Sequence, residues 1–203
     1  MTITAGLAKA EIKWNRIARL SLVGRTIEVL PEYDRLYRWL GLDGLFLYNH
    51  AAELHEVKEY ERSVSVFEKC VHYYNDMDVQ LLLASNYRQI GKNAEAEQHL
   101  ILASHMCPSR FKPLYELVKL YEATGNREKA LALAAIIINR EVKIPSATIT
   151  AIKNEMRRLI ETQETTSSDP ATQGRTSEET DKEEKTRQGN TQKVQSNGAA
   201  LPP

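Results

Sequence analysis

The feature that most constrains the fold is a spacing of 34 residues that recurs in the middle of the chain. Residues of one type stand 34 positions apart in three pairs: Tyr87 and Tyr121, Gly91 and Gly125, Ala96 and Ala130. A period of this length is longer than an ordinary helix or strand, so it predicts a supersecondary unit that is copied along the chain. The chain is therefore expected to be an array of such units.

Residues 77–110 hold the most complete copy, MDVQLLLASNYRQIGKNAEAEQHLILASHMCPSR. Gly91 falls where a residue tolerant of positive φ would end a first helix, and Pro108 falls where a second helix must stop. The pattern resembles the tetratricopeptide repeat, a helix–turn–helix unit, and only Gln80 departs clearly from its template. Two antiparallel helices can approach closely where small side chains meet, which is the role expected of Ala84, Ala96 and Ala103.

The same register extends to both sides and predicts an all-α, tetratricopeptide-type helical-repeat solenoid of about three to four repeats. Residues 10–43 (degenerate), 44–76, 77–110 and 111–144 are the expected repeats. Pro31 falls inside the second helix of the first repeat and predicts either a kink or a helix start delayed to about residue 30. Ser146 is a suitable N-cap for a capping helix over residues 146–162.

These assignments divide the chain into two parts. The predicted tetratricopeptide-repeat domain spans residues 7–162. Residues 163–203 contain no aromatic side chain and are rich in Thr, Ser, Gln and charged residues, so they are predicted to form a disordered polar tail.

Residue types that carry catalysis do not form a recognisable pattern. The five histidines include no pair at i, i+4 spacing, and neither a phosphate-binding glycine loop nor a nucleophile elbow is present. Cys70 and Cys107 lack the spacing of a zinc site or a disulfide framework, and Cys70 is expected to be a buried, inert thiol. The sequence therefore predicts a protein that is not an enzyme, with no catalytic, cofactor-binding or metal site.

Charge and hydropathy limit the partners that the chain can bind. The 203 residues include 27 basic and 27 acidic side chains, a formal net charge of zero, so nucleic acid is not an expected partner. Residues 130–138 form the longest apolar run, which is far shorter than a membrane span. The N-terminus lacks the apolar core of a secretory signal. The expected location is cytoplasmic, with no direct membrane insertion and membrane association only through a partner.

The geometry of a stacked array predicts where a partner would bind. First helices of such repeats turn inward and form a concave groove that suits an extended peptide or a helix. Positions 5, 9 and 12 of these helices supply the candidate partner-binding residues Tyr48, His55, Ser85, Arg88, Tyr115, Lys119 and Glu122. The alternative interpretation is that these side chains form an ordinary solvated surface.

Residues 12–160 also resemble the C-terminal tetratricopeptide region of bacterial O-antigen ligase/polymerase-type membrane proteins. The most distinctive shared stretches are MCPSRFKPLY at residues 106–115 and VKIPS at residues 142–146, which the general repeat template does not demand. The catalytic part of that family is a bundle of transmembrane helices, which this sequence does not contain, so no catalytic residue is carried over. The resemblance implies an accessory module that docks to a membrane protein of surface-polysaccharide assembly.

Two functions follow as hypotheses. The first is a non-catalytic protein–protein interaction or scaffold module that binds a peptide or helix in its groove. The second is a soluble regulatory or assembly subunit of a membrane glycan ligase or polymerase, or a truncated fragment of one.

Overall fold

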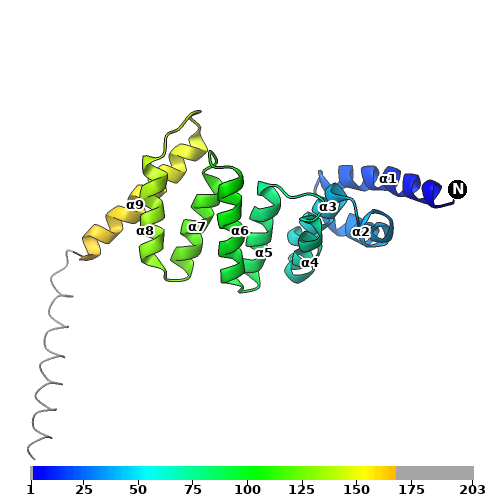
Figure 1. Ribbon diagram of the computed structural model, residues 1–203, viewed down its shortest axis with the longest axis horizontal. Coiled ribbons are helices and arrows are strands. Elements are labelled where there is room, and N and C mark those ends of the chain that lie inside the picture. The colour runs from blue at the N-terminus through cyan, green and yellow to red at the C-terminus, as the bar shows by residue number, and fades with distance from the viewer. Residues whose placement is uncertain (1, 168–203) are drawn as a thin grey trace, which may run out of the picture. The chain divides into compact units, whose positions relative to one another are not determined.

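The computed structural model describes residues 2–167, with side chains described between residues 4 and 162. Within these residues all regular secondary structure is helical (Figure 1). The helices are α1 (Thr2–Ser21), α2 (Thr26–Leu40), α3 (Gly44–Glu56), α4 (Tyr60–Cys70), α5 (Met77–Gln89), α6 (Asn93–Met106), α7 (Lys112–Ala123), α8 (Arg127–Asn139) and α9 (Ala147–Ser167).

The described residues divide after Met156 into two units, and each unit is described by itself. The predicted disordered tail lies outside the described residues from residue 168 onward. None of the helices that can be described is both long enough and apolar enough to cross a membrane.

Consecutive helices of the first unit pack as pairs: α1 with α2, α3 with α4, α5 with α6, and α7 with α8 (Figure 1). Each pair also packs on the next one, through α2 on α3, α4 on α5, and α6 on α7. The first helix α3 additionally contacts the first helices α1 and α5. This is the arrangement of stacked helix–turn–helix repeats, in which each repeat buries its apolar surface against its neighbours.

Small residues lie at the helix crossings, as the sequence predicts. In the central pair, α5 and α6, these small residues are Ala84, Ala96 and Ala103, and each is at most 1% exposed. Leu83 and Leu100 fill the adjacent space and are equally buried. Close packing of the two helices therefore depends on alanine at three positions, where a larger side chain would force them apart.

Tyrosine–glutamate hydrogen bonds connect successive repeats. The Tyr87 hydroxyl of α5 donates to Glu68 of α4 at 2.6 Å, and the Tyr121 hydroxyl of α7 donates to Glu97 of α6 at 2.7 Å. Burial, reinforced by the glutamate bond, raises the pKa of Tyr121 to about 12. Because both tyrosines occupy position 11, the same polar bond recurs at both interfaces.

Gln80, which departs from the repeat template, is almost completely buried. Its amide nitrogen donates to Asn75 Oδ1 at 2.6 Å, and its Oε1 lies 2.6 Å from His99 Nδ1. The His99 ring in turn stacks on Tyr87, with ring centres 5.2 Å apart. Gln80 is therefore tolerated at an apolar position because both ends of its amide have partners.

The second helix of the first repeat differs from the prediction. α2 begins at Thr26 and contains Pro31 in its interior, so the predicted delay of its start to about residue 30 is wrong. Pro31 removes one backbone hydrogen bond, but α2 buries Tyr33 completely in a cluster that includes Phe46. Trp14 packs in the same cluster, with its ring centre 5.8 Å from that of Phe46 in an edge-to-face arrangement. Tertiary packing, which supplies most helix stability in proteins, outweighs the missing bond.

The last helix begins as predicted. Ile149 N–H donates to Ser146 Oγ at 3.2 Å, which confirms Ser146 as the N-cap of α9. The helix continues beyond residue 162, the predicted end of the capping helix, to Ser167. The limits of the repeat domain itself, residues 7–162, stay a prediction.

A residue with positive φ follows the first helix of each repeat. Three of these residues are glycines, Gly24, Gly91 and Gly125, with φ of 78°, 76° and 73°. The second repeat has Lys58 at this place, with φ of 64°. A lysine is strained there, because its Cβ crowds the backbone in the left-handed region.

Lys58→Gly is expected to raise the free energy of unfolding by about 0.5–1 kcal/mol. The substitution relieves left-handed strain of ~1–2 kcal/mol, partly offset by the extra freedom of glycine in the unfolded chain. Gly91→Lys is the matched control and should lower the free energy of unfolding by a similar amount. Urea denaturation of both variants measures the two shifts, and a Lys58→Gly protein no more stable than the wild type would contradict the strain.

Two histidines, one buried and one half-buried, have a lowered pKa. His50 is 3% exposed, stacks on Tyr33 and has Nε2 at 3.2 Å from Asp34 Oδ1, while Arg62 bonds the same carboxylate. Burial lowers the pKa of His50, against the opposing charge of Asp34. Burial also lowers the pKa of His99.

Acidification is therefore expected to destabilise the protein. A histidine whose pKa is lower in the folded state binds its proton first in the unfolded state. The contribution of each histidine to the free energy of unfolding is then fully present above the unfolded pKa of about 6.5. It falls as the pH drops below this value, by at most ~1.4 kcal/mol per pH unit for each histidine. Urea denaturation between pH 7.5 and 5.5 measures the slope. His99→Gln should flatten it, whereas His105→Gln, which alters an exposed histidine, should leave it unchanged.

Candidate partner-binding site

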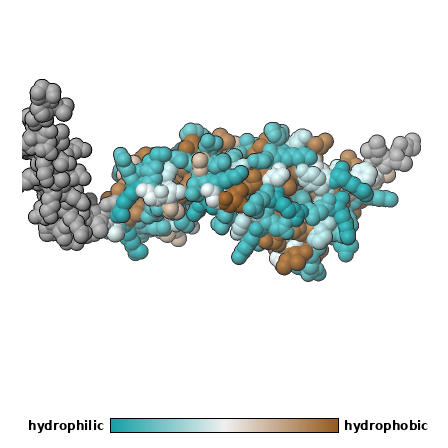
Figure 2. Space-filling view, turned by 90° about the horizontal axis from the view of Figure 1, so that it is seen from below, coloured by the Kyte–Doolittle hydropathy of each residue, from teal (hydrophilic) through white to brown (hydrophobic). Residues whose placement is uncertain are grey.

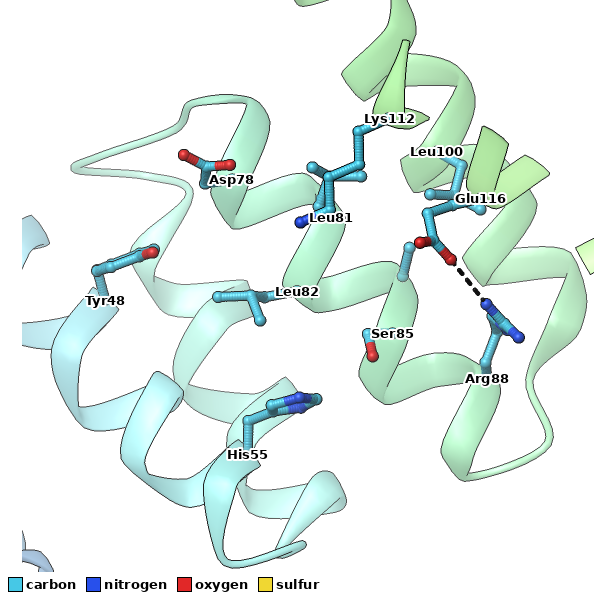
Figure 3. A pocket seen from close by; sticks show the side chains of 11 residues that line it. Tyr48, His55, Asp78, Leu81, Leu82, Ser85, Arg88, Leu100, Lys112 and Glu116 are labelled. Carbon is cyan, nitrogen blue, oxygen red and sulfur yellow. Dashed lines mark hydrogen bonds and ion pairs between the residues drawn. The ribbon is translucent and has the colours of Figure 1, made fainter. Parts of the chain in front are cut away.

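A pocket of about 390 Å³ lies among the first helices α3, α5 and α7 (Figure 3). Its floor is apolar, with Leu81 and Leu82 projecting from α5. Charged side chains surround this floor, two acidic and two basic. The complete lining is Tyr48, His55, Asp78, Leu81, Leu82, Ala84, Ser85, Arg88, Leu100, Lys112 and Glu116.

Four of the seven candidate residues line this pocket, namely Tyr48, His55, Ser85 and Arg88. The three candidates from α7, Tyr115, Lys119 and Glu122, do not line it. The Tyr115 hydroxyl donates to Glu155 of α9 at 2.9 Å, and Lys119 Nζ lies 5.2 Å from the centre of the Tyr115 ring. Glu122 is exposed near the end of the same helix.

The α7 wall of the pocket is formed by Lys112 and Glu116, which the sequence reasoning did not select. A groove between two first helices has two walls, one from each helix. Positions 5, 9 and 12 form the wall on the earlier helix, and positions 2 and 6 form the wall on the later one. A usable signal was present, since Asp78 and Lys112 are charged residues at position 2 of successive repeats.

An ion pair joins the two helices on either side of the pocket. Arg88 of α5 donates to Glu116 Oε2 of α7 at 3.2 Å, drawn as the dashed line in Figure 3. The two side chains are 29% and 25% exposed, so the pair is shielded from solvent on most sides. It holds the guanidinium at the pocket wall while leaving other N–H groups of Arg88 for a ligand.

A buried hydrogen-bond chain fixes the orientation of His55. Asn86, which is fully buried, donates from Nδ2 to Ser63 Oγ at 2.7 Å, and Ser63 donates to the Ala51 carbonyl at 2.7 Å. Asn86 Oδ1 is thus the acceptor for His55 Nδ1–H, at 2.6 Å. Neutral His55 therefore has an unprotonated Nε2, a hydrogen-bond acceptor, on a ring that points into the pocket (Figure 3).

Two charged groups of the pocket are left without a hydrogen bond or ion pair among the described residues. Asp78, in the first turn of α5, and Lys112, at the start of α7, make no hydrogen bond or ion pair with any residue that the structure describes. Burial, and then the charge of Asp78, raises the pKa of Tyr48, so its hydroxyl keeps its proton at neutral pH and can donate a hydrogen bond. The pocket thus offers an anion, a cation, a phenol donor and an imidazole acceptor around an apolar floor.

This set of groups is suited to recognition by shape, charge and hydrogen bonding. Within the described part of the chain, Ser85 and His55 share no hydrogen bond, and no three His, Cys, Asp or Glu side chains are grouped to hold a metal. The lining mixes apolar and charged groups in the manner of a site for a polypeptide segment.

Comparisons with known proteins identify the fold. No protein-family model and no curated protein sequence matches the chain. Among solved structures, a crystal structure of MamA aligns over 96% of this chain and 100% of its own, with a TM-score of 0.59 and 11% identity. MamA 41-end from Desulfovibrio magneticus RS-1 aligns over 76% and 77%, with a TM-score of 0.55 and 15% identity.

The structure of YrrB, a TPR protein with an unusual peptide-binding site, aligns over 66% of this chain and 72% of the YrrB chain. Its TM-score is 0.55 and its identity to this chain is 16%. With its paired helices and 34-residue register, the chain therefore has the all-α, tetratricopeptide-type helical-repeat solenoid fold.

Proposed function

We propose that the chain is a non-catalytic protein–protein interaction module that binds a peptide or helix of a partner protein between α3, α5 and α7. The observation that carries this proposal is the pocket, which combines an apolar floor with the unpaired charges of Asp78 and Lys112. Support also comes from YrrB, a TPR protein of similar fold with an unusual peptide-binding site.

The pocket favours a particular kind of segment. Its volume of about 390 Å³ accommodates an apolar side chain or two over Leu81 and Leu82. An acidic residue of the partner would pair with Lys112, and a basic residue would pair with Asp78. His55 Nε2 and the Tyr48 hydroxyl would bond an N–H and a C=O of the partner backbone. The partner is therefore a segment with an apolar anchor flanked by opposite charges.

Peptides selected by the purified chain from a random peptide library test this proposal. Ser85→Arg places a large charged side chain over the floor and is expected to weaken binding at least tenfold, about 1.4 kcal/mol. Lys112→Glu is expected to weaken the binding of peptides that carry an acidic residue by about fivefold or more. Isothermal titration calorimetry measures both affinities.

Lys119→Glu is the matched control, because it makes the same charge change on the same helix outside the pocket. Its affinity should equal that of the wild type. If Lys119→Glu and Lys112→Glu weaken binding equally, or if Ser85→Arg has no effect, the partner does not bind in this pocket.

A second candidate function is an accessory role in surface-polysaccharide (O-antigen) assembly, as a subunit of a membrane glycan ligase or polymerase. The support for it is the sequence resemblance at residues 106–115 and 142–146. Affinity purification of the tagged chain from detergent-solubilised membranes of its host, followed by mass spectrometry, tests this role. The accessory role requires that the wild-type chain recovers a multi-span membrane protein, and that the Ser85→Arg chain recovers less of the same protein.

A further inference from the structure

The turn between α1 and α2 carries exposed aliphatic side chains. Leu22 and Val23 in the turn are 87% and 69% exposed, and Ile27 in the first turn of α2 is 82% exposed. A Cβ added at Gly24, in the same turn, would meet nothing within 4 Å, so the turn is open to solvent at this point. The face seen in Figure 2 is largely hydrophilic, with apolar groups scattered over it. Single exposed leucines are common, but three exposed aliphatic side chains within residues 22–27 mark an interaction surface.

Positive charge lies next to this turn. Arg16 and Arg19 share one face of α1, together with Ile12, which is 72% exposed. Neither arginine has a hydrogen bond or ion pair with any described residue. Arg25 and Lys13, by contrast, are paired with Glu28 and Glu32. The two unpaired guanidinium groups therefore give the aliphatic turn a cationic border.

We propose that the α1–α2 turn docks on the surface of an anionic lipid bilayer. Leu22, Val23 and Ile27 would enter the boundary between headgroups and acyl chains, and Arg16 and Arg19 would contact anionic headgroups. Such docking needs no membrane span, and the zero net charge of the whole chain conceals the local excess of positive charge.

The combination of exposed aliphatic side chains and unpaired arginines favours lipid over protein as the partner. A fluid bilayer admits such side chains without a preformed cavity, whereas a protein would have to offer an apolar hollow bordered by acidic groups. Lipid headgroups and acyl chains supply the two required chemistries at one surface. The peptide pocket between α3, α5 and α7 takes no part in this contact.

Co-sedimentation of the full chain with vesicles tests the proposal. Vesicles of phosphatidylcholine with phosphatidylglycerol should bind the protein, and pure phosphatidylcholine should bind it much more weakly. Leu22→Ser with Val23→Ser should weaken binding at least tenfold, because most of the inserted apolar surface is lost. Arg16→Gln and Arg19→Gln should each weaken it roughly fivefold, and added salt should act in the same direction.

Lys143→Gln with Ile144→Ser is the matched control, because it removes an exposed basic–aliphatic pair at another site, where Ile144 is 80% exposed. This control should bind vesicles like the wild type. Equal losses in control and turn variants, or no preference of the wild type for anionic vesicles, would overturn the proposal. Self-association that disappears in the Leu22→Ser, Val23→Ser protein, without vesicle binding by the wild type, would instead assign the turn to a second copy.

Discussion

Gly44→Ala is expected to lower the free energy of unfolding by about 3 kcal/mol, at the upper end of the range for overpacking. A Cβ on Gly44 would lie 2.4 Å from Tyr74 Cβ, 2.9 Å from the Tyr74 backbone nitrogen and 3.0 Å from the Tyr73 carbonyl carbon. None of these atoms can move away by a change of side-chain rotamer. The start of α3 must therefore separate from the turn that follows α4, which loosens both helices of the second repeat.

Thermal denaturation measures this effect, which corresponds to a decrease in Tm of roughly 6–12 °C for a chain of this size. Gly125→Ala is the matched control, because a Cβ there would meet nothing within 4 Å and only the positive φ opposes it. Gly125→Ala should lower the free energy of unfolding by about 1 kcal/mol. A Gly44→Ala protein as stable as the control would show that α3 and residues 73–74 do not approach so closely.

Asn86→Leu is expected to lower the free energy of unfolding by about 2–3 kcal/mol. Leucine has a similar volume, so the loss comes from the hydrogen-bond chain and not from a cavity. Without the amide, His55 Nδ1–H loses its acceptor and the fully buried Ser63 loses a donor. His55 would also no longer be held as the tautomer with a free Nε2, so peptide affinity should fall along with stability.

A double-mutant cycle isolates this contribution. Ser63→Ala by itself leaves the Asn86 amide without its acceptor, although alanine is the residue that the repeat template places there. The double variant Ser63→Ala, Asn86→Leu should therefore cost less than the sum of the two single variants, by ~1 kcal/mol. Strict additivity, measured by urea denaturation, would mean that the two side chains are not coupled.

The fold could be predicted because helix pairing depends on a few spaced residues. Small residues such as Ala84 and Ala96 permit close approach only in one register, and that register repeats every 34 residues. Two local features did not follow from the pattern. Lys58 adopts a glycine-like φ because the helices on both sides determine the turn, and Pro31 lies inside α2 because packing outweighs one lost hydrogen bond.

The candidate site could be predicted only in part. The repeat template identifies which positions of a single helix are left uncovered, and so it supplied Tyr48, His55, Ser85 and Arg88. It does not identify which side of the next helix faces them, and therefore Lys112 and Glu116 were missed. The support of His55 by Asn86 was missed as well, because a hydrogen-bond chain across three helices depends on side-chain positions that the sequence pattern does not contain.

The left-handed residues between paired helices have a consequence for how such a chain can change its length. Residues 91–124 begin at Gly91 and end directly before Gly125, two glycines with nearly the same φ of 76° and 73°. A tandem duplication of this segment would join Thr124 to a second Gly91 and so repeat a backbone junction that the chain already forms. The duplicated chain would gain one helix pair and a further groove without any new turn conformation. Recombination at these glycines can thus lengthen the array, and with it the proposed binding surface, in whole repeats.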